Sequence, residues 1–231
     1  MNNFPLIIRD LHYTYPRGSE VLRGVNLTLE RDMRLALVGK NGSGKSTLLS
    51  HIPGLLSGPG HIEVEGTVRQ RKTMGKIRSM VGFLFSQSDY HFIMPTLLSD
   101  IMLSVPGGDK EHSLEKATAL MEKLGLRGYE KSNPLELSSG EMKRAALGGV
   151  LAKEPKLLLL DEPLNNLDRP GALALTEILV SLSLPMVIAT HHLMAVKSLA
   201  THVAVMDEGR VGPLYPLNQA LEREEVQNLL L

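Results

Sequence analysis

Apolar runs long enough for a single strand alternate along this chain with segments that show helical periodicity. The first third predicts strands over residues 6–11, 25–29 and 35–38, and the last of these leads into a glycine-rich loop. A helix is expected over residues 47–56, and residues 81–85 form another strand-sized apolar run. Strands that alternate with helices indicate an α/β protein.

The middle of the chain changes to helical spacing. From residue 113 onward apolar residues recur on one helical face, and Gly125 closes this helix. A second helix is expected over residues 142–150, before Pro155. The mainly helical stretch of about residues 88–152 is therefore expected to be a lobe inserted between two strands of the sheet.

Strand-sized runs return in the last third, at residues 157–160 and 186–190. Apolar residues on either side of the turn at 207–210 predict a hairpin. Residues 218–231 are expected to form an amphipathic helix. The strands that follow helical segments imply a mostly parallel core sheet covered on both faces, and we expect residues 1–231 to form a single domain.

Composition narrows the range of functions. The chain carries 25 basic and 25 acidic residues, which argues against binding nucleic acid through a general positive charge. The absence of cysteine excludes disulfides, a thiol nucleophile and thiolate zinc sites. No apolar run approaches the ~18 residues of a membrane span, so the chain by itself is expected to be soluble.

Residues 39–46 read Gly-Lys-Asn-Gly-Ser-Gly-Lys-Ser and match the P-loop pattern between a strand and a helix. Glycines permit tight turns in which successive backbone N–H groups can point at phosphate oxygens. Lys45 is expected to bring a full positive charge to the β- and γ-phosphates, and the Ser46 hydroxyl to ligate Mg²⁺. The pattern predicts a nucleotide site.

Two carboxylates end the Leu-rich run at residues 157–160, and a histidine ends the next strand. Ligands bind at the carboxyl ends of parallel strands, where neighbouring residues point to opposite faces. We therefore assign Asp161 to the Mg²⁺ shell and Glu162 to the attacking water as general base or orienter. His191 is expected to contact the γ-phosphate or the water, and His192 is the weaker candidate.

Residues 137–141 read Leu-Ser-Ser-Gly-Glu before the second helix of the middle region. Two hydroxyls and a glycine at a helix start make a good cap, and the same geometry makes an anion site. Physical reasoning alone does not choose between these two interpretations.

Together these segments resemble the ATPase subunits of ABC transporters over essentially the whole chain. The P-loop, residues 137–141, the Leu-rich strand that ends in Asp161 and Glu162, and the Thr190–His191 pair occur in the family's order and spacing. The resemblance implies a P-loop NTPase fold of ABC type: a mostly parallel sheet core, an inserted helical lobe and an N-terminal antiparallel β portion.

The resemblance also implies a head-to-tail dimer that sandwiches two ATP molecules with Mg²⁺. Ser138, Ser139, Gly140 and Glu141 of one subunit would act in trans on the nucleotide held by the other, and Asp168 falls at the inter-subunit loop. Tyr15 lies where the family stacks an aromatic ring on adenine. The expected nucleotide contacts are then Tyr15, Gly39, Asn41, Gly42, Ser43, Gly44, Lys45, Ser46 and Thr47.

This sequence departs from the family pattern at several positions. Ser139 replaces a glycine, Glu141 replaces a glutamine, and His192 stands where aspartate is common. The family's lobe-joining glutamine aligns with Ser86, one residue before Gln87. We favour Gln87 as the residue that reaches Mg²⁺ through a shifted loop register; the other possibility is that this contact is weakened.

Short matches at residues 93–96 and 148–152 resemble the energy-coupling-factor group and its cobalt, nickel and biotin relatives. The resemblance implies an ATPase, peripheral at the cytoplasmic face of the membrane, that powers import of a vitamin such as biotin or of a transition-metal ion. Its partners would be a second ATPase subunit, identical or related, and transmembrane subunits, with or without a substrate-binding membrane component. The loop around residues 89–92 and the helical lobe would contact the membrane subunit.

Three alternatives remain from the sequence. The chain could be a soluble ABC ATPase that acts in translation or repair, although it has one P-loop, no sustained heptads and no basic surplus. It could serve another transporter type. It could also be a degenerate cassette that binds ATP without hydrolysing it, because of Ser86 and Ser139.

Overall fold

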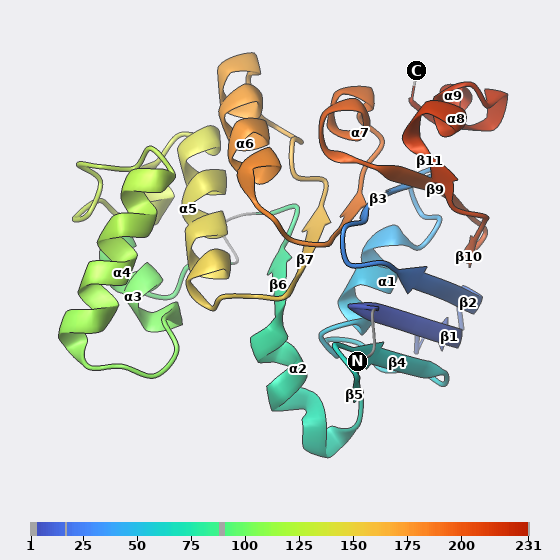
Figure 1. Cartoon of the computed structure of the whole chain (residues 1–231), viewed down its shortest axis with the longest axis horizontal. Helices are drawn as coiled ribbons and strands as arrows, with labels where there is room; N and C mark the ends of the chain where they lie inside the picture. The colour runs from blue at the N-terminus through green and yellow to red at the C-terminus, as the bar shows by residue number, and fades with distance from the viewer. Residues whose placement is uncertain (1–3, 17, 88–90, 231) are drawn as a thin grey trace.

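The computed structural model of the 231-residue chain describes residues 4–16, 18–87 and 91–230. Five parallel strands form its central sheet in the order β9-β3-β8-β7-β6, and two short antiparallel strands, β10 and β11, pair with β9 (Figure 1). The bounds of these strands are β3 (Arg34–Val38), β6 (Val81–Leu84), β7 (Leu157–Asp161), β8 (Met186–Ala189), β9 (His202–Asp207), β10 (Arg210–Val211) and β11 (Tyr215–Pro216).

An antiparallel sheet from the first third of the chain lies beside the central one (Figure 1). Its strands follow the order β2-β1-β4-β5. Helix α1 packs in the core shared by the two sheets, where Leu48 and Leu49 are fully buried. The bounds of these elements are β1 (Leu6–Thr14), β2 (Glu20–Leu29), β4 (His61–Val64), β5 (Thr67–Val68) and α1 (Lys45–His51).

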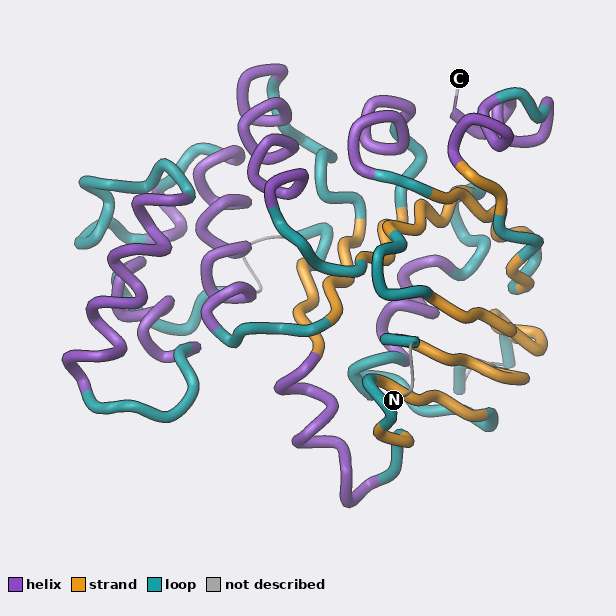
Figure 2. The backbone as a smooth tube through the Cα atoms, viewed as in Figure 1, coloured by secondary structure: helices purple, strands orange, loops and turns teal. Residues whose placement is uncertain are grey.

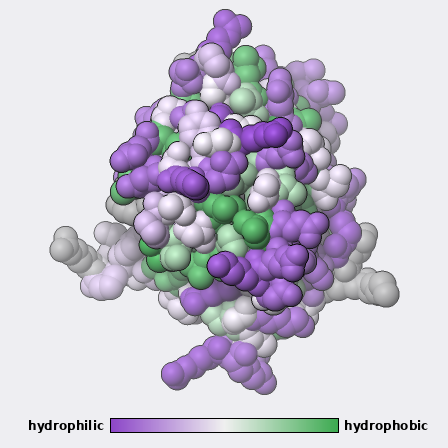
Figure 3. Space-filling model, turned by 90° about the vertical axis from the view of Figure 1, so that its left-hand side faces the viewer, coloured by the Kyte–Doolittle hydropathy of each residue, from purple (hydrophilic) through white to green (hydrophobic). Residues whose placement is uncertain are grey.

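Three helices, α3 (Leu97–Ser104), α4 (Lys110–Lys123) and α5 (Ser139–Ala152), form a lobe at the opposite end of the molecule (Figure 2). They bury Ile101, Met121 and other apolar side chains in a core that continues onto the central sheet. The outer side of this lobe is a mostly hydrophilic surface around a small apolar area (Figure 3). The chain thus has the α/β fold with an inserted helical lobe that the sequence predicted.

The central strands are apolar without interruption because both of their faces are covered. Leu157 and Leu159 pack in the core of α1 and the antiparallel sheet, whereas Leu158 and Leu160 pack with the helices on the other face. The remaining helices are α2 (Met74–Met80), α6 (Arg169–Ser181), α7 (Leu193–Leu199), α8 (Leu217–Leu221) and α9 (Glu224–Leu230).

Two predicted helices were wrong in their extent. The helix expected over residues 47–56 begins at Lys45 and ends at His51, because Pro53 and the positive φ of Gly54 (69°) follow. The single helix expected over residues 218–231 is two short helices, α8 and α9, that are separated by Glu222 and Arg223.

Within the described ranges, no helix combines the length and the apolar character that crossing a bilayer requires. Residues 88–90, which open the predicted lobe and carry part of the loop expected to touch a membrane subunit, lie outside the described residues. The single domain over residues 1–231 stays a prediction.

Candidate functional site

The loop between β3 and α1 makes the tight turns that a phosphate-binding loop requires. Gly42 and Gly44 have φ angles of 83° and 111°, a region that residues with a Cβ rarely adopt. The Lys45 ammonium donates to the carbonyl oxygens of Gly39 (2.6 Å) and Lys40 (3.1 Å), so this side chain reaches back over the loop. The Ser43 hydroxyl is buried without a hydrogen-bond partner among the described residues, so it is available to donate to a phosphate oxygen.

A cavity beside this loop gathers most of the predicted nucleotide contacts. The Tyr15 hydroxyl lies 3.2 Å from the Thr47 hydroxyl, and its half-exposed ring stands at the edge of the cavity. Gly39 and Ser43 lie in the loop itself without lining the cavity. The lining residues are Tyr15, Val21, Asn41, Gly42, Gly44, Lys45, Ser46, Thr47 and Glu162.

Charges in the cavity influence one another across the sheet edge. Burial lowers the pKa of the Lys45 ammonium, and the carboxylates of Glu162 and Asp161 oppose that shift. Burial also raises the pKa of the Asp161 carboxyl, and the hydrogen bond from Ser46 opposes this second shift. Opposite charges are thus held together at the end of β7, where an ionised ligand would meet both.

Ser46 and Asp161, which the sequence analysis assigned to Mg²⁺, lie next to each other in the fold. The Ser46 hydroxyl donates to Asp161 Oδ1 at 2.9 Å, although the two residues are 115 positions apart in the chain. A hydroxyl and a carboxylate are oxygen ligands of the kind that Mg²⁺ prefers, and Ser46 lines the nucleotide cavity while Asp161 accepts the hydrogen bond from it. The donor set therefore fits this ion.

Glu162 and His191 meet because β7 and β8 are parallel neighbours whose register pairs Asp161 with Ala189. The next residues along both strands consequently lie side by side, and Glu162 N donates to Ala189 O at 2.8 Å. His191 Nδ1 lies 2.8 Å from Glu162 Oε1. Glu162 has a φ of 46°, which is uncommon outside glycine and is found at functional turns.

The start of α5 is a capping box. Ser138 and Glu141 satisfy each other reciprocally: Ser138 N and Oγ donate to Glu141 Oε2 at 2.9 and 2.6 Å, and Glu141 N donates to Ser138 Oγ at 3.4 Å. The Tyr129 hydroxyl donates to the other carboxylate oxygen at 2.5 Å. These bonds, with the one from Ser138 Oγ contributing most, lower the pKa of the Glu141 carboxyl to about 2, so it carries its charge at neutral pH.

A second hollow joins this helix start to the beginning of α6, and it shares no lining residue with the nucleotide cavity. Ser138, Gly140, Glu141 and Asp168 all line it. Asp168 caps α6 by accepting from Gly171 N at 3.0 Å. The residues expected to act in trans are thus grouped together, apart from the residues expected to act in cis. Ser139, the first residue of α5, is exposed beside them.

The predicted lobe-joining residue, Gln87, is exposed and does not line the nucleotide cavity. Next to it stands a residue that the sequence analysis missed. Lys143 on α5 is 2% exposed, and its ammonium donates to the carbonyl oxygens of Ser86 (2.6 Å) and Phe85 (3.4 Å). Burial lowers the pKa of Lys143 to about 8, against the opposing pull of Asp161 and Glu162.

Helical spacing offered a signal for Lys143. It lies three residues after Gly140 and four before Leu147, which are both buried, so it belongs to the inward face of α5. A lysine on such a face needs partners in the interior. Here the partners are the backbone carbonyls of the segment that leaves β6.

The parallel sheet, the P-loop cavity and the two carboxylates at the end of β7 define a P-loop nucleoside triphosphatase. The family model for ABC transporters matches residues 22–165, and the chain belongs to that family. It is an ATPase whose hydrolysis of ATP is coupled to transport, and it binds ATP. Membership in the ABC transporter family favours a role in transport over the alternative roles in translation or repair.

Similar proteins indicate which group of the family this chain resembles. It is 36% identical to the energy-coupling factor transporter ATP-binding protein EcfA of Methanoculleus marisnigri, over 94% of this chain and 81% of the relative. It is also 36% identical to EcfA of Methanothermobacter thermautotrophicus, over 88% of this chain and 68% of the relative. The resemblance to the energy-coupling-factor group is thereby confirmed.

Solved structures agree with the fold. The structure of cbiO1 from Clostridium perfringens, part of the ABC transporter complex cbiONQ, has a TM-score of 0.85 and 29% identity over 98% of this chain and 94% of that one. The dimeric bacterial ABC transporter cassette MJ0796 has a TM-score of 0.82 over 92% of this chain and 98% of that one, at 23% identity. The predicted ABC-type fold is thus confirmed.

Proposed function

We propose that this chain powers import of a vitamin or a transition-metal ion by closing on ATP as a head-to-tail dimer. The proposal is supported by relatives named for energy-coupling factor transporters and by the neighbour that is part of cbiONQ. It places the chain at the cytoplasmic face of the membrane, bound to transmembrane subunits and to a second ATPase subunit.

One observation supports the proposal: the P-loop cavity and the hollow at the start of α5 are lined by entirely different residues of one copy. The P-loop cavity holds Lys45, while Ser138, Gly140 and Asp168 line a separate hollow. The helix start at Ser138 and the capping carboxylate of Asp168 line no part of the P-loop cavity, and they could act on a nucleotide if a facing subunit brings its own P-loop to them. Two such half-sites related by two-fold symmetry form an interface that ATP completes.

In the closed pair, Lys45 and the backbone of residues 39–46 hold the phosphates, and the Tyr15 ring stacks on the base. Ser46 and Asp161 would hold Mg²⁺ with Gln87 from the lobe-joining segment, and the ion would neutralise charge on the β- and γ-phosphates. ATP favours closure more than ADP does, because the trans contacts are made to the γ-phosphate.

Glu162 accepts the proton of the attacking water or orients that water. Its carboxylate is positioned by the contact of 2.8 Å with His191 Nδ1 and by its location beside the P-loop cavity. His191 thereby holds the carboxylate in place and has its other ring nitrogen available for the γ-phosphate. Loss of the γ-phosphate removes the trans contacts, and the pair reopens.

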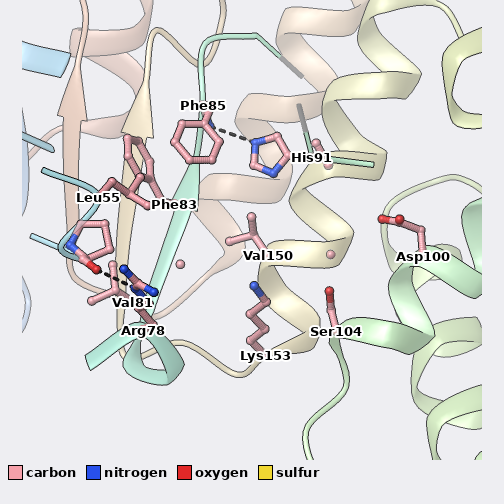
Figure 4. A pocket seen from close by; sticks show the side chains of 14 residues that line it. Leu55, Arg78, Val81, Phe83, Phe85, His91, Asp100, Ser104, Val150 and Lys153 are labelled. Carbon is pink, nitrogen blue, oxygen red and sulfur yellow. Dashed lines mark hydrogen bonds between the residues drawn. The ribbon is translucent and has the colours of Figure 1, made fainter. Parts of the chain in front are cut away.

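A groove between the central sheet and the helical lobe offers a place for the membrane subunit (Figure 4). On one side the ring centroids of Phe83 and Phe85 lie 4.2 Å apart with their planes tilted by 41°, and Asp100 and Ser104 of α3 lie on the other side. Phe85 N donates to His91 Nε2 at 3.0 Å, which ties the groove to the segment that follows β6. A partner segment inserted into this groove would therefore contact the central sheet and the helical lobe at the same time.

Replacing Lys45 with alanine tests the nucleotide site. We expect ATP affinity to fall at least about tenfold, because a charge-assisted contact to the phosphates is lost. Calorimetry with Mg-ATP on the full chain measures this, and Lys40→Ala, which changes an exposed side chain in the same loop, is the matched control. Equal ATP affinity in Lys45→Ala and the parent would refute the site.

Transport itself is tested with the intact complex. The chain is purified from detergent-solubilised membranes with its partners, and the complex is reconstituted in vesicles that contain ATP on the side of the ATPase. ATP-dependent accumulation of biotin, cobalt or nickel supports the proposal. Copurification with no membrane protein would contradict it.

A further inference from the structure

Three metal-ligating side chains converge where β7 and β8 end. They are Glu162, His191 and His192, and one ligand atom from each lies within 4.8 Å of the other two. We refer to these residues as the Glu–His–His cluster. The sequence analysis gave His192 no firm role, yet this residue completes a third ligand position beside the two groups assigned to hydrolysis.

The backbone fixes the cluster. The register of β7 against β8 brings Glu162 beside the residues after Ala189, and Glu162 N donates to Ala189 O at 2.8 Å. His192 is the N-cap of α7, and its N–H donates to the Thr190 hydroxyl at 3.1 Å. The two histidine rings lie with their centroids 4.2 Å apart and their planes 33° apart. The three ligands are therefore held by two strand ends and a helix start.

Two buried polar atoms of the cluster have no hydrogen-bond partner among the residues that the structure describes. They are Glu162 Oε2 and His192 Nε2. Leaving a buried polar atom without a partner is unfavourable, and two such atoms in one cluster indicate a ligand that satisfies both. The third member, His191, is 43% exposed at its side chain, so the cluster remains open to solution.

We propose that Glu162, His191 and His192 bind a divalent cation of the Zn²⁺, Co²⁺ and Ni²⁺ class, and that the bound cation inhibits ATP hydrolysis. Two imidazoles and one carboxylate are the donor set that these ions favour, whereas Mg²⁺ prefers an all-oxygen shell. Ligands of tetrahedral zinc lie about 3.3 Å apart, given bonds of about 2.0–2.2 Å. Small rotations of the three side chains would bring their ligand atoms from within 4.8 Å of one another to this spacing.

The inhibitory consequence rests on the proposed function. A cation on the Glu162 carboxylate would remove the lone pairs that accept the proton of the attacking water, and a cation on His191 would remove its contact with the γ-phosphate. In an importer whose cargo is a transition-metal ion, this would slow the ATPase when the ion accumulates on its own side of the membrane. The binding step needs none of these roles.

Cobalt binding to the full chain tests the site directly. The nucleotide-free protein is freed of metal with a chelator and titrated with Co²⁺, whose visible absorption strengthens in a low-symmetry protein site. We expect one equivalent to bind to the parent chain and His192→Asn to bind at least about tenfold more weakly. Glu162→Gln is a second variant with the same expected loss, and circular dichroism confirms that both fold.

The matched control is His61→Asn. His61 also lies beside a carboxylate, with Nε2 3.4 Å from Glu63 Oε2, but this pair belongs to no group of three metal-ligating side chains among the described residues. We expect parental Co²⁺ affinity in this control. Parental affinity in His192→Asn, or no binding to the parent, would overturn the proposed site.

Inhibition is measured separately, as the ATPase rate in excess Mg-ATP with added Zn²⁺, each protein being compared with its own zinc-free rate. We expect half-inhibition of His192→Asn to need at least about tenfold more Zn²⁺ than the parent. Binding without inhibition would overturn the regulatory half of the proposal. Lys45→Ala separates the two hypotheses, because it should lose ATP binding and keep Co²⁺ binding.

Discussion

Lys143 shows how a single buried charge can connect two functional segments. Its ammonium is held by the carbonyl oxygens of Phe85 and Ser86, so α5 and the segment that leaves β6 are tied at one point. The nearby carboxylates of Asp161 and Glu162 favour its charged form, and burial disfavours it. Because the pKa of Lys143 is lowered to about 8, the folded protein should release this proton in a mildly alkaline range.

The pKa shift of Lys143 predicts a stability change with pH. Between the folded pKa of about 8 and the ordinary value of 10.5, the unfolded chain holds more protons, so the free energy of unfolding rises with pH. The contribution of Lys143 to this rise is about 2 kcal/mol between about pH 8 and about pH 10. Denaturant unfolding at both pH values should show this rise in the parent relative to Lys143→Met.

The matched control for Lys143 is the exposed Lys197. Lys197→Met should keep the pH dependence of the parent, because it removes an exposed ammonium and leaves the buried ammonium of Lys143 in place. The same slope in Lys143→Met and in the parent would show that the ammonium titrates outside this range.

Glu141 places a full negative charge at the end of the surface proposed to meet a phosphate. Hydrogen bonds from Ser138 and Tyr129 keep the pKa of its carboxyl at about 2. The carboxylate also holds the Ser138 hydroxyl at 2.6 Å. Charge repulsion and competition for this hydroxyl both oppose a facing γ-phosphate.

Glu141→Gln should therefore lower the ATP concentration for half-maximal ATPase activity by roughly threefold to tenfold. The helix start should survive, because glutamine also completes a capping box. The effect should shrink as salt is added, since mobile ions screen the charge that was removed. Glu136→Gln, an exposed carboxylate two residues before the capping serine, should change nothing; an equal effect in both variants would contradict this account.

Local sequence patterns predicted most of the site at the residue scale. Lys45, Ser46, Asp161 and Glu162 could be proposed because a P-loop and a strand that ends in carboxylates are contiguous in the sequence. Lys143 was missed because its partners are backbone atoms 57 and 58 positions away, which no side-chain pattern records. Gln87 stays a prediction, since its side chain lies outside the nucleotide cavity in this conformation.

At the scale of elements, the contact of β6 with α5 sets how the lobe meets the sheet. Gly82 is opposite Leu158 in the parallel register. A Cβ at Gly82 would lie 2.6 Å from Val150 Cγ1 and 3.0 Å from the ring of Pro155. No room therefore exists for a side chain between the strand and the helix.

Gly82→Ala should destabilise the protein by about 1–3 kcal/mol, because the inserted methyl forces α5 or Pro155 to move. Gly75→Ala is the matched substitution in the exposed first turn of α2, where a Cβ meets nothing within 4 Å. It should leave stability unchanged or raise it by up to about 1 kcal/mol, because alanine is the better helix former. Denaturant midpoints measure both, and equal midpoints would refute the packing argument.

At the scale of the whole molecule, the proposed function depends on two copies closing over ATP. The separation of the P-loop cavity from the hollow lined by Ser138 and Asp168 leaves each copy with two incomplete half-sites. Hydrolysis removes the group that joins them. Blocking hydrolysis while preserving ATP binding should therefore accumulate the closed pair.

Glu162→Gln should lower the ATPase rate at least about 100-fold by removing the group that accepts a proton or orients the water. With Mg-ATP, light scattering should then show a dimer that ADP does not support. Lys45→Ala combined with Glu162→Gln should stay monomeric, because it cannot hold the nucleotide. A parental hydrolysis rate in Glu162→Gln would refute the role given to this residue.

The sequence by itself determined the family and the α/β class, and it supplied the predicted roles of the P-loop and of the carboxylates at the β7 end, because each of these is encoded in contiguous residues. The apolar runs also specified strands that are buried on both faces. Only the tertiary structure decided that helix 47–56 ends at His51, that the C-terminal segment folds as two short helices, and that Lys143 reaches the β6 segment. It alone decided that His192 joins Glu162, since that contact depends on strand register, and register is a property of the folded sheet.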